Sequence, residues 1–204
     1  MTEYIQFPRY SIFLTPSQPF LDDLKLFYKK NNLSYNKIPQ SIYGIHYTVK
    51  APFYISHLYS ENDLINHFNS LNVISVHNIF KRSFKVIGLS DFKKNLVLEL
   101  ESDQEFNFFV HDIMRSFDIY RITLDNNGIK KDLSRFGQLS KKELIYYQIW
   151  GYPYYFECGK HHISLVNSNP KLKLINFNPV NYESLKLLKQ KSANESFKEI
   201  ATLI

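Results

Sequence analysis

The chain has 204 residues, of which 44% are hydrophobic and 16% aromatic, and it contains six glycines and eight prolines. This composition excludes a long disordered or low-complexity protein, and the length fits one domain or two small lobes. The formal net charge of +6 favours anionic partners such as nucleotides, RNA or phosphorylated metabolites.

The single cysteine, Cys158, excludes an internal disulfide and a cysteine-rich zinc site, and we expect it to be a packed thiol. No apolar segment follows Met1, and no window approaches the roughly 18 apolar residues of a membrane span. We therefore expect a soluble, cytoplasmic protein that does not enter a membrane.

Hydrophobic periodicity predicts alternating strands and helices in the first 120 residues. The helices show apolar residues at a spacing of 3.6, and the polar sequence DFKK separates two strands that we expect to pair as a hairpin. The predicted elements are strand 8–14, a helix through 21–28, strand 41–53, helix 61–71, strands 83–92 and 95–102, and a helix from about 103 to 117. This order indicates the α+β class.

The second half begins with residues 125–140, the most polar connector and the best candidate for a mobile or lobe-joining segment. Ser140 and Glu143 then form a capping-box pattern that predicts a helix, which ends at Gly151. Residues 160–167 alternate as a short strand. The C-terminal stretch 181–204 is interpreted as one or two surface helices.

Two of these strands carry a histidine followed two residues later by a hydroxyl. In strand 41–53, His46 and Thr48 share one face, and the apolar residues share the other. In strand 160–167, His162 and Ser164 share one face in the same way. Each strand is therefore expected to present an imidazole and a hydroxyl side by side to a cleft.

Paired histidines suit the cleavage of a phosphodiester. In-line attack at phosphorus needs a base for the incoming oxygen, an acid for the departing oxygen, and donors for the phosphoryl oxygens. With an ordinary pKa of about 6.5, one imidazole can act as the base while the other acts as the acid. The hydroxyls of Thr48 and Ser164 can donate hydrogen bonds to the non-bridging oxygens, and this chemistry requires no metal.

The sequence around both histidines resembles the two-histidine phosphoesterase superfamily. It resembles most closely the branch encoded with phosphonate-utilisation genes, which is described as a family of unknown function. The resemblance rests on YGIHYTVKAPF (43–53) and IWGYPYYFECGKHHISLV (149–166), and it extends to RYSIFLTP (9–16), FDIYR (117–121) and RFGQLSKKELIYYQIWGYPY (135–154).

This resemblance implies a single bilobal domain over residues 1–204, in which two pseudo-symmetric antiparallel sheets face a central cleft and helices lie outside. It implies that His46 and Thr48 form the first catalytic motif, that His162 and Ser164 form the second, and that neither a metal nor a cofactor takes part. Superfamily substrates are cyclic nucleotides, RNA ends, ribose cyclic phosphates, 2′-5′ oligoadenylates and cyclic signalling nucleotides.

The chain departs from the branch at three points. Ser164 replaces the commoner threonine, which keeps the hydroxyl. His161 stands where the branch has an apolar residue, so it is a rival catalyst, although the spacing to the hydroxyl selects His162. An arginine pair is reduced to Arg135, with Lys130 and Lys131 nearby.

Further residues are candidates for binding the substrate. Cations can neutralise a phosphate, and tyrosine rings can line the cleft or stack on a base. The candidates are Lys160, Arg121, Arg135, Tyr43 and Tyr154. The remaining histidines have no metal-ligand spacing, and we expect surface or interface positions for His57, His67, His77 and His111.

Three functions remain open from the sequence. The first is a metal-independent phosphodiesterase that acts on a cyclic or linear nucleotide, an RNA end or a ribose phosphodiester. The second is a module that binds RNA or a nucleotide without turnover. The third is a hydrolase of cyclic oligonucleotide signals in the conflict between host and phage.

Overall fold

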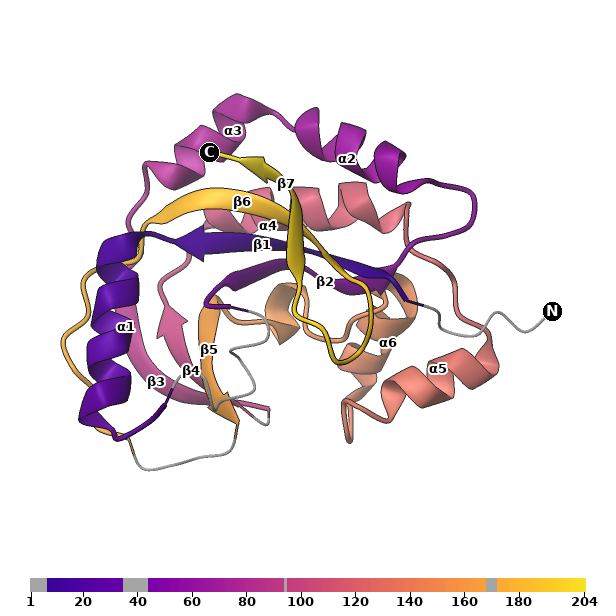
Figure 1. Ribbon diagram of the computed structural model, residues 1–204. Coiled ribbons are helices and arrows are strands. Elements are labelled where there is room, and N and C mark those ends of the chain that lie inside the picture. The colour runs from indigo at the N-terminus through magenta and orange to yellow at the C-terminus, as the bar shows by residue number, and fades with distance from the viewer. Residues whose placement is uncertain (1–6, 35–43, 94, 168–171) are drawn as a thin grey trace.

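Two antiparallel sheets carry the α+β fold, as expected, in a computed structural model that describes residues 7–34, 44–93, 95–167 and 172–204 (Figure 1). The four-stranded sheet has the order β2-β1-β6-β7, and the three-stranded sheet has the order β3-β4-β5. The strands are β1 (Arg9–Pro16), β2 (Tyr47–Tyr54), β3 (Val86–Phe92), β4 (Asn95–Leu100), β5 (His162–Asn167), β6 (Tyr182–Gln190) and β7 (Lys198–Leu203). The helices are α1 (Gln18–Lys30), α2 (Glu61–Asn69), α3 (Val73–Phe80), α4 (Gln104–Asp118), α5 (Asn126–Leu133), α6 (Lys141–Trp150) and the 3₁₀ turn Phe156–Cys158.

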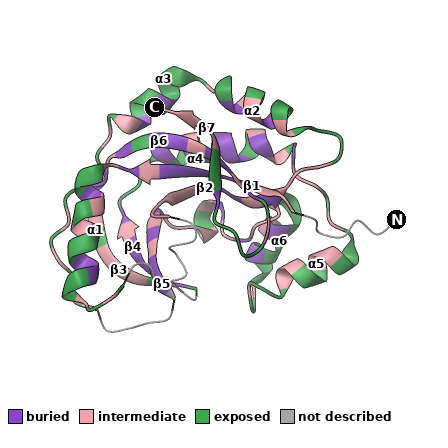
Figure 2. Cartoon of the chain, in the orientation of Figure 1, coloured by how far each residue is buried: buried purple, intermediate pink, exposed green. Residues whose placement is uncertain are grey.

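The four-stranded sheet has two faces of different character. Ile12 and Leu14 on β1 stand opposite Leu187 and Leu185 on β6, and all four side chains are fully buried. Helices α2, α3 and α4 contact this sheet and lie along one side of it, with their outward faces exposed (Figures 1 and 2). Because side chains alternate along a strand, the intervening residues such as Phe13 point to the opposite face.

The three-stranded sheet packs against α1 through its last strand. The hydroxyl of Tyr28 on α1 donates a hydrogen bond of 3.1 Å to the carbonyl oxygen of Leu165 on β5. Leu98 on β4 and Ile163 on β5 are fully buried in the same hydrophobic core that contains the inner face of the four-stranded sheet. One continuous core therefore joins the two sheets.

Helix α6 begins and ends as its sequence predicts. The hydroxyl of Ser140 accepts from the backbone N–H of Glu143, and the carboxylate of Glu143 accepts from the backbone N–H of Ser140. At the other end, Gly151 adopts a left-handed conformation with φ of 68°. A Cβ atom there would also lie only 2.8 Å from the Arg121 side chain, so glycine is required by both backbone and packing.

The prediction of surface helices in residues 181–204 is wrong, because this stretch forms β6 and β7. Leu185 and Leu188 satisfy a helical spacing, whereas Leu185 and Leu187 satisfy a strand spacing, so the sequence fits both patterns. The position of β6 between β1 and β7 decides the outcome, because a strand there gains hydrogen bonds from both sides.

The connector 125–140 is not entirely irregular, since it contains helix α5. Asp125 caps this helix by accepting a 2.7 Å hydrogen bond from the backbone N–H of Gly128. The hydroxyl of Tyr147 on α6 donates to Asp132 on α5 at 3.0 Å. Helix α5 is short and buries no residue, so its few apolar residues are easily read as part of a polar connector. The sequence analysis also missed α3, which follows α2 closely.

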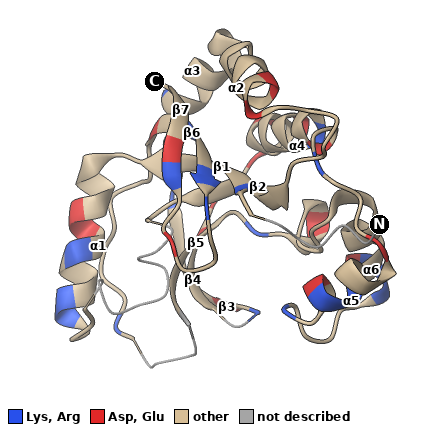
Figure 3. Ribbon diagram, turned by 45° about the vertical axis from the view of Figure 1, so that its right-hand side comes forward, with Lys and Arg blue, Asp and Glu red and all other residues tan. Residues whose placement is uncertain are grey.

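Within the described residues, no helix combines the length and apolar character needed to cross a membrane. Basic and acidic residues are intermixed along α1 and α5 (Figure 3).

Candidate active site

The two histidine motifs lie on edge strands that meet. β2 is at one edge of the four-stranded sheet, β5 is at one edge of the three-stranded sheet, and the two strands contact each other. His162 is the first residue of β5, and His46 directly precedes β2. Strand 41–53 was therefore predicted too long, because Gly44 has a φ of 73° and turns the chain before His46; residues 41–43 lie outside the described residues.

His46 is held by one backbone group, one hydroxyl and one ring. Its Nδ1 lies 2.8 Å from the carbonyl oxygen of Gly44, and its Nε2 lies 3.1 Å from the hydroxyl of Thr48. The imidazole stacks on Phe13, with the ring centroids 3.6 Å apart. Burial lowers the pKa of His46 from 6.5 to about 4, and the charge of His162 contributes in the same direction.

His162 has corresponding partners in the other sheet. Its Nδ1 lies 2.7 Å from the carbonyl oxygen of Lys160, two residues earlier, as the carbonyl of Gly44 is for His46. The ring of Phe92 lies against the imidazole, with the centroids 4.7 Å apart. Burial lowers the pKa of His162, and the charge of Lys160 contributes in the same direction, whereas the hydrogen bond to the Lys160 carbonyl and the charge of Glu99 oppose the change.

These contacts select the same tautomer for both histidines. A carbonyl oxygen can only accept a hydrogen bond, so Nδ1 carries the proton in each ring and Nε2 carries the lone pair. The lowered pKa of both rings favours the neutral form near pH 7. His46 and His162 are therefore both prepared to accept a proton at Nε2. An anion bound between them would raise both pKa values, which allows one ring to become the acid.

The second motif opens into a polar cavity of about 710 Å³. Thr48 from β2 and Ser164 from β5 both line it, together with His162. The two hydroxyls predicted to bind phosphoryl oxygens therefore line the same polar cavity, although they come from different sheets. Among the residues that the structure describes, no three or more His, Cys, Asp and Glu side chains form a group able to hold a metal ion.

The rival histidine, His161, is a core residue. It is only 6% exposed, its Nδ1 lies 2.6 Å from the carbonyl oxygen of Glu101, and its Nε2 lies 2.8 Å from the Tyr182 hydroxyl. Its ring also stacks on Phe106 with centroids 4.1 Å apart. His161 also borders the polar cavity, but its Nε2 contacts the buried Tyr182, whereas Nε2 of His46 contacts the motif hydroxyl of Thr48. The arrangement therefore supports the choice of His162 from the spacing to the hydroxyl.

Lys160 and Tyr154, two of the predicted substrate-binding residues, line the polar cavity, and Lys160 is paired there. Its Nζ lies 2.7 Å from the Glu99 carboxylate and 3.5 Å from the Ser90 hydroxyl. Tyr154 has the Nζ of Lys93 4.6 Å from its ring centroid. Lys93 also lines the cavity and is a cation that the sequence analysis did not single out.

The structure does not bring the other predicted binding residues into this cavity. Arg121 and Arg135 line a separate pocket of about 70 Å³. Arg121 donates to the Asp118 carboxylate at 2.9 and 3.1 Å and to the carbonyl oxygen of Ile149 at 2.8 Å, which gives it a structural role. Arg135 pairs with Asp132 at 3.0 Å. Tyr43 lies outside the described residues.

Sequence reasoning missed several residues of the site. Phe13 and Phe92 support the two imidazoles, and Asn95 and Asn107 line the polar cavity. Alternation along β1 places Phe13 opposite Ile12 and Leu14, but the sequence does not show that it stands across from Thr48. The contact depends on strand register, for which the sequence contains no signal.

Burial of His161 predicts how stability depends on pH. Burial lowers the pKa of His161 to about 3 from 6.5 in the unfolded chain. Between these values the unfolded chain binds more protons, so the free energy of unfolding falls as the pH decreases below about 6.5. We expect His161→Gln to make this decline shallower in urea titrations between pH 4.5 and 7.5. His57→Gln, which removes an exposed imidazole, is the matched control, and equal slopes in both variants would contradict the prediction.

Comparison with known proteins identifies a family. No curated protein matches the chain. A family model described as a protein of unknown function (DUF1045) matches residues 48–197. This range covers well over half of the chain and contains Thr48, His162 and Ser164, and it begins two residues after His46. The chain therefore belongs to the DUF1045 family.

Proposed function

We propose that the protein is a metal-independent phosphodiesterase of the two-histidine phosphoesterase type. One observation carries the proposal: at the start of each of two edge strands lies a histidine whose Nδ1 is fixed by the carbonyl two residues before it, with a hydroxyl two residues after it. His162 lines the polar cavity, and His46 contacts Thr48, which lines the same cavity. The pair supplies two similarly prepared imidazoles, which is what acid–base cleavage of a phosphodiester requires.

In the proposed reaction, Nε2 of one histidine takes a proton from a water molecule or a ribose hydroxyl as that oxygen attacks phosphorus. The bond from phosphorus to the leaving oxygen breaks, and the other imidazolium gives its Nε2 proton to that oxygen. Thr48 and Ser164 donate hydrogen bonds to the non-bridging oxygens. The phosphate charge stabilises the imidazolium against the burial that lowers its pKa.

A substrate panel tests the proposal. We expect the purified protein to release product from one or more of 2′,3′-cyclic nucleotides, ribose cyclic phosphates, 2′-5′ oligoadenylate, and cyclic di- and trinucleotides. EDTA should leave the rate unchanged, because the two imidazoles carry out both proton transfers. Chromatography with mass identification of products is the measurement. Binding without product across the panel would favour a binding module, and loss of turnover in EDTA would contradict metal independence.

A further inference from the structure

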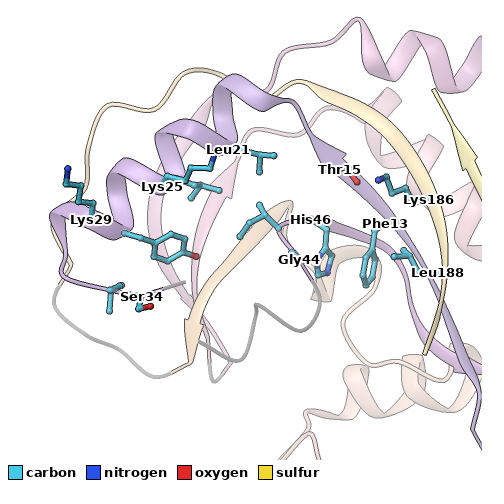
Figure 4. Close-up of a pocket in the computed structure, with 14 residues that line it drawn as sticks. Phe13, Thr15, Leu21, Lys25, Lys29, Ser34, Gly44, His46, Lys186 and Leu188 are labelled. Atoms are coloured by element: carbon cyan, nitrogen blue, oxygen red, sulfur yellow. Dashed lines mark hydrogen bonds between the residues drawn. The ribbon is translucent and has the colours of Figure 1, made fainter. Parts of the chain in front are cut away.

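His46 lines a second cavity, of about 730 Å³, which is separate from the polar cavity (Figure 4). The cavity is enclosed by α1, β1, β6 and the chain at residues 44–46. Its volume is within the range of small-molecule sites. The polar cavity described above has a separate lining, and the two meet at His46 and Thr48, whose side chains are 3.1 Å apart.

The walls of this second cavity are mainly hydrocarbon. Strand register places Phe13 on β1 directly opposite Lys186 on β6, so these side chains project from the sheet face that the helices α2 to α4 do not cover. Leu188 lies on the same face of β6. Leu21, which Figure 4 labels, and Leu24 and Tyr28 on α1 extend the apolar lining, together with Leu33 and Ile45.

The charged residues of this lining are all basic. Lys25 and Lys29 come from α1, and Lys186 comes from β6. Lys25 and Lys186 pair with Asp22 and Glu199, which are not part of the lining. Among the described residues, no acidic side chain lines the cavity. A cationic group would be repelled there, whereas a neutral apolar group attached to an anion is compatible with both the walls and the rim.

We propose that this cavity holds a hydrocarbon substituent of the phosphodiester that lies between His46 and His162. The inference rests on the proposed function and specifies the substrate class: a phosphodiester that joins a polar ribose or nucleotide part, placed in the polar cavity, to an alkyl or aryl group. A nucleobase is the competing occupant, because Thr15, Ser34 and the lysines of the lining could bond its polar atoms, whereas the apolar walls favour a hydrocarbon group.

The test measures the binding of alkyl phosphates, so its result does not depend on whether the protein hydrolyses a phosphodiester. The probes are methyl n-alkyl phosphates with one, four and eight carbons in the variable chain, which all carry a single negative charge. Dissociation constants are measured by calorimetry on the full-length protein. We expect affinity to increase about 3- to 4-fold for each methylene that enters the cavity. Affinity that does not depend on chain length would overturn the inference, whatever the substrate panel shows.

A matched pair of variants on α1 tests whether the alkyl chain of the probe binds in this cavity. Leu21→Asn places a polar group in the cavity wall, whereas Leu26→Asn makes the same change on the same helix outside it. We expect Leu21→Asn to weaken octyl binding at least 10-fold and to leave the methyl probe unchanged, and Leu26→Asn to affect neither. Equal losses in both variants would place the chain elsewhere. An adenosine cyclic phosphate that loses as much affinity as the octyl probe would assign the cavity to a base instead.

Discussion

Replacing either motif histidine with alanine will reduce kcat/KM for the hydrolysed phosphodiester by about 10²- to 10⁴-fold, the usual contribution of a positioned acid or base. His46 and His162 act in the same bond-breaking step, so the double variant should lose little more than the more severe single variant. Thermal unfolding should show a folded protein in each case, because both residues are partly exposed and neither belongs to the main hydrophobic core. Wild-type turnover in the double variant would refute the proposed mechanism.

The conservative variant His162→Asn separates proton transfer from positioning. The asparagine amide can donate to the carbonyl oxygen of Lys160, as Nδ1 does now, but it cannot titrate. We expect His162→Asn to be as inactive as His162→Ala, and His57→Ala, at an exposed position, to retain full activity. Substantial activity in His162→Asn would mean that His162 serves only to position the substrate.

Local sequence patterns were sufficient to predict features that depend on a single strand or on one end of a helix. The spacing to Ser164 selected His162, and the structure buries the neighbouring His161, although both histidines border the polar cavity. The capping box at Ser140 and the stop at Gly151 are likewise local, and both are confirmed.

The sequence was not sufficient to predict features that depend on contacts between segments far apart in the chain. Residues 182–190 fit a helix or a strand, and only pairing with β1 and β7 makes them a strand. Arg121 follows an aromatic run and was expected to bind phosphate, yet it pairs with Asp118 and bonds the carbonyl of Ile149, at the end of a helix that begins some 20 residues later. The apolar cavity is also invisible in the sequence, since its walls come from α1, β1 and β6.

Lys50, Asp118 and Arg121 form a buried ionic network that ties the first motif strand to α4 and α6. Lys50 on β2 is 1% exposed, and its ammonium contacts Asp118, at the end of α4. Burial lowers the pKa of Lys50 to about 8, although Asp118 opposes the change. Arg121 then links Asp118 to the carbonyl of Ile149, near the end of α6. The Asp118 carboxylate therefore pairs with both cations, Lys50 and Arg121.

Asp118→Ala should lower the free energy of unfolding by about 3–5 kcal/mol, because it leaves the Lys50 charge buried without a partner. Lys50→Met removes that charge, fills a similar volume and keeps the pair between Asp118 and Arg121, so its cost should be far smaller. Adding Lys50→Met to Asp118→Ala should restore stability in urea titrations at pH 7. Asp22→Ala, which breaks an exposed pair with Lys25, is the control and should change little. If the double variant is less stable than Asp118→Ala alone, Lys50 stabilises the fold by packing and not through its pairing with Asp118.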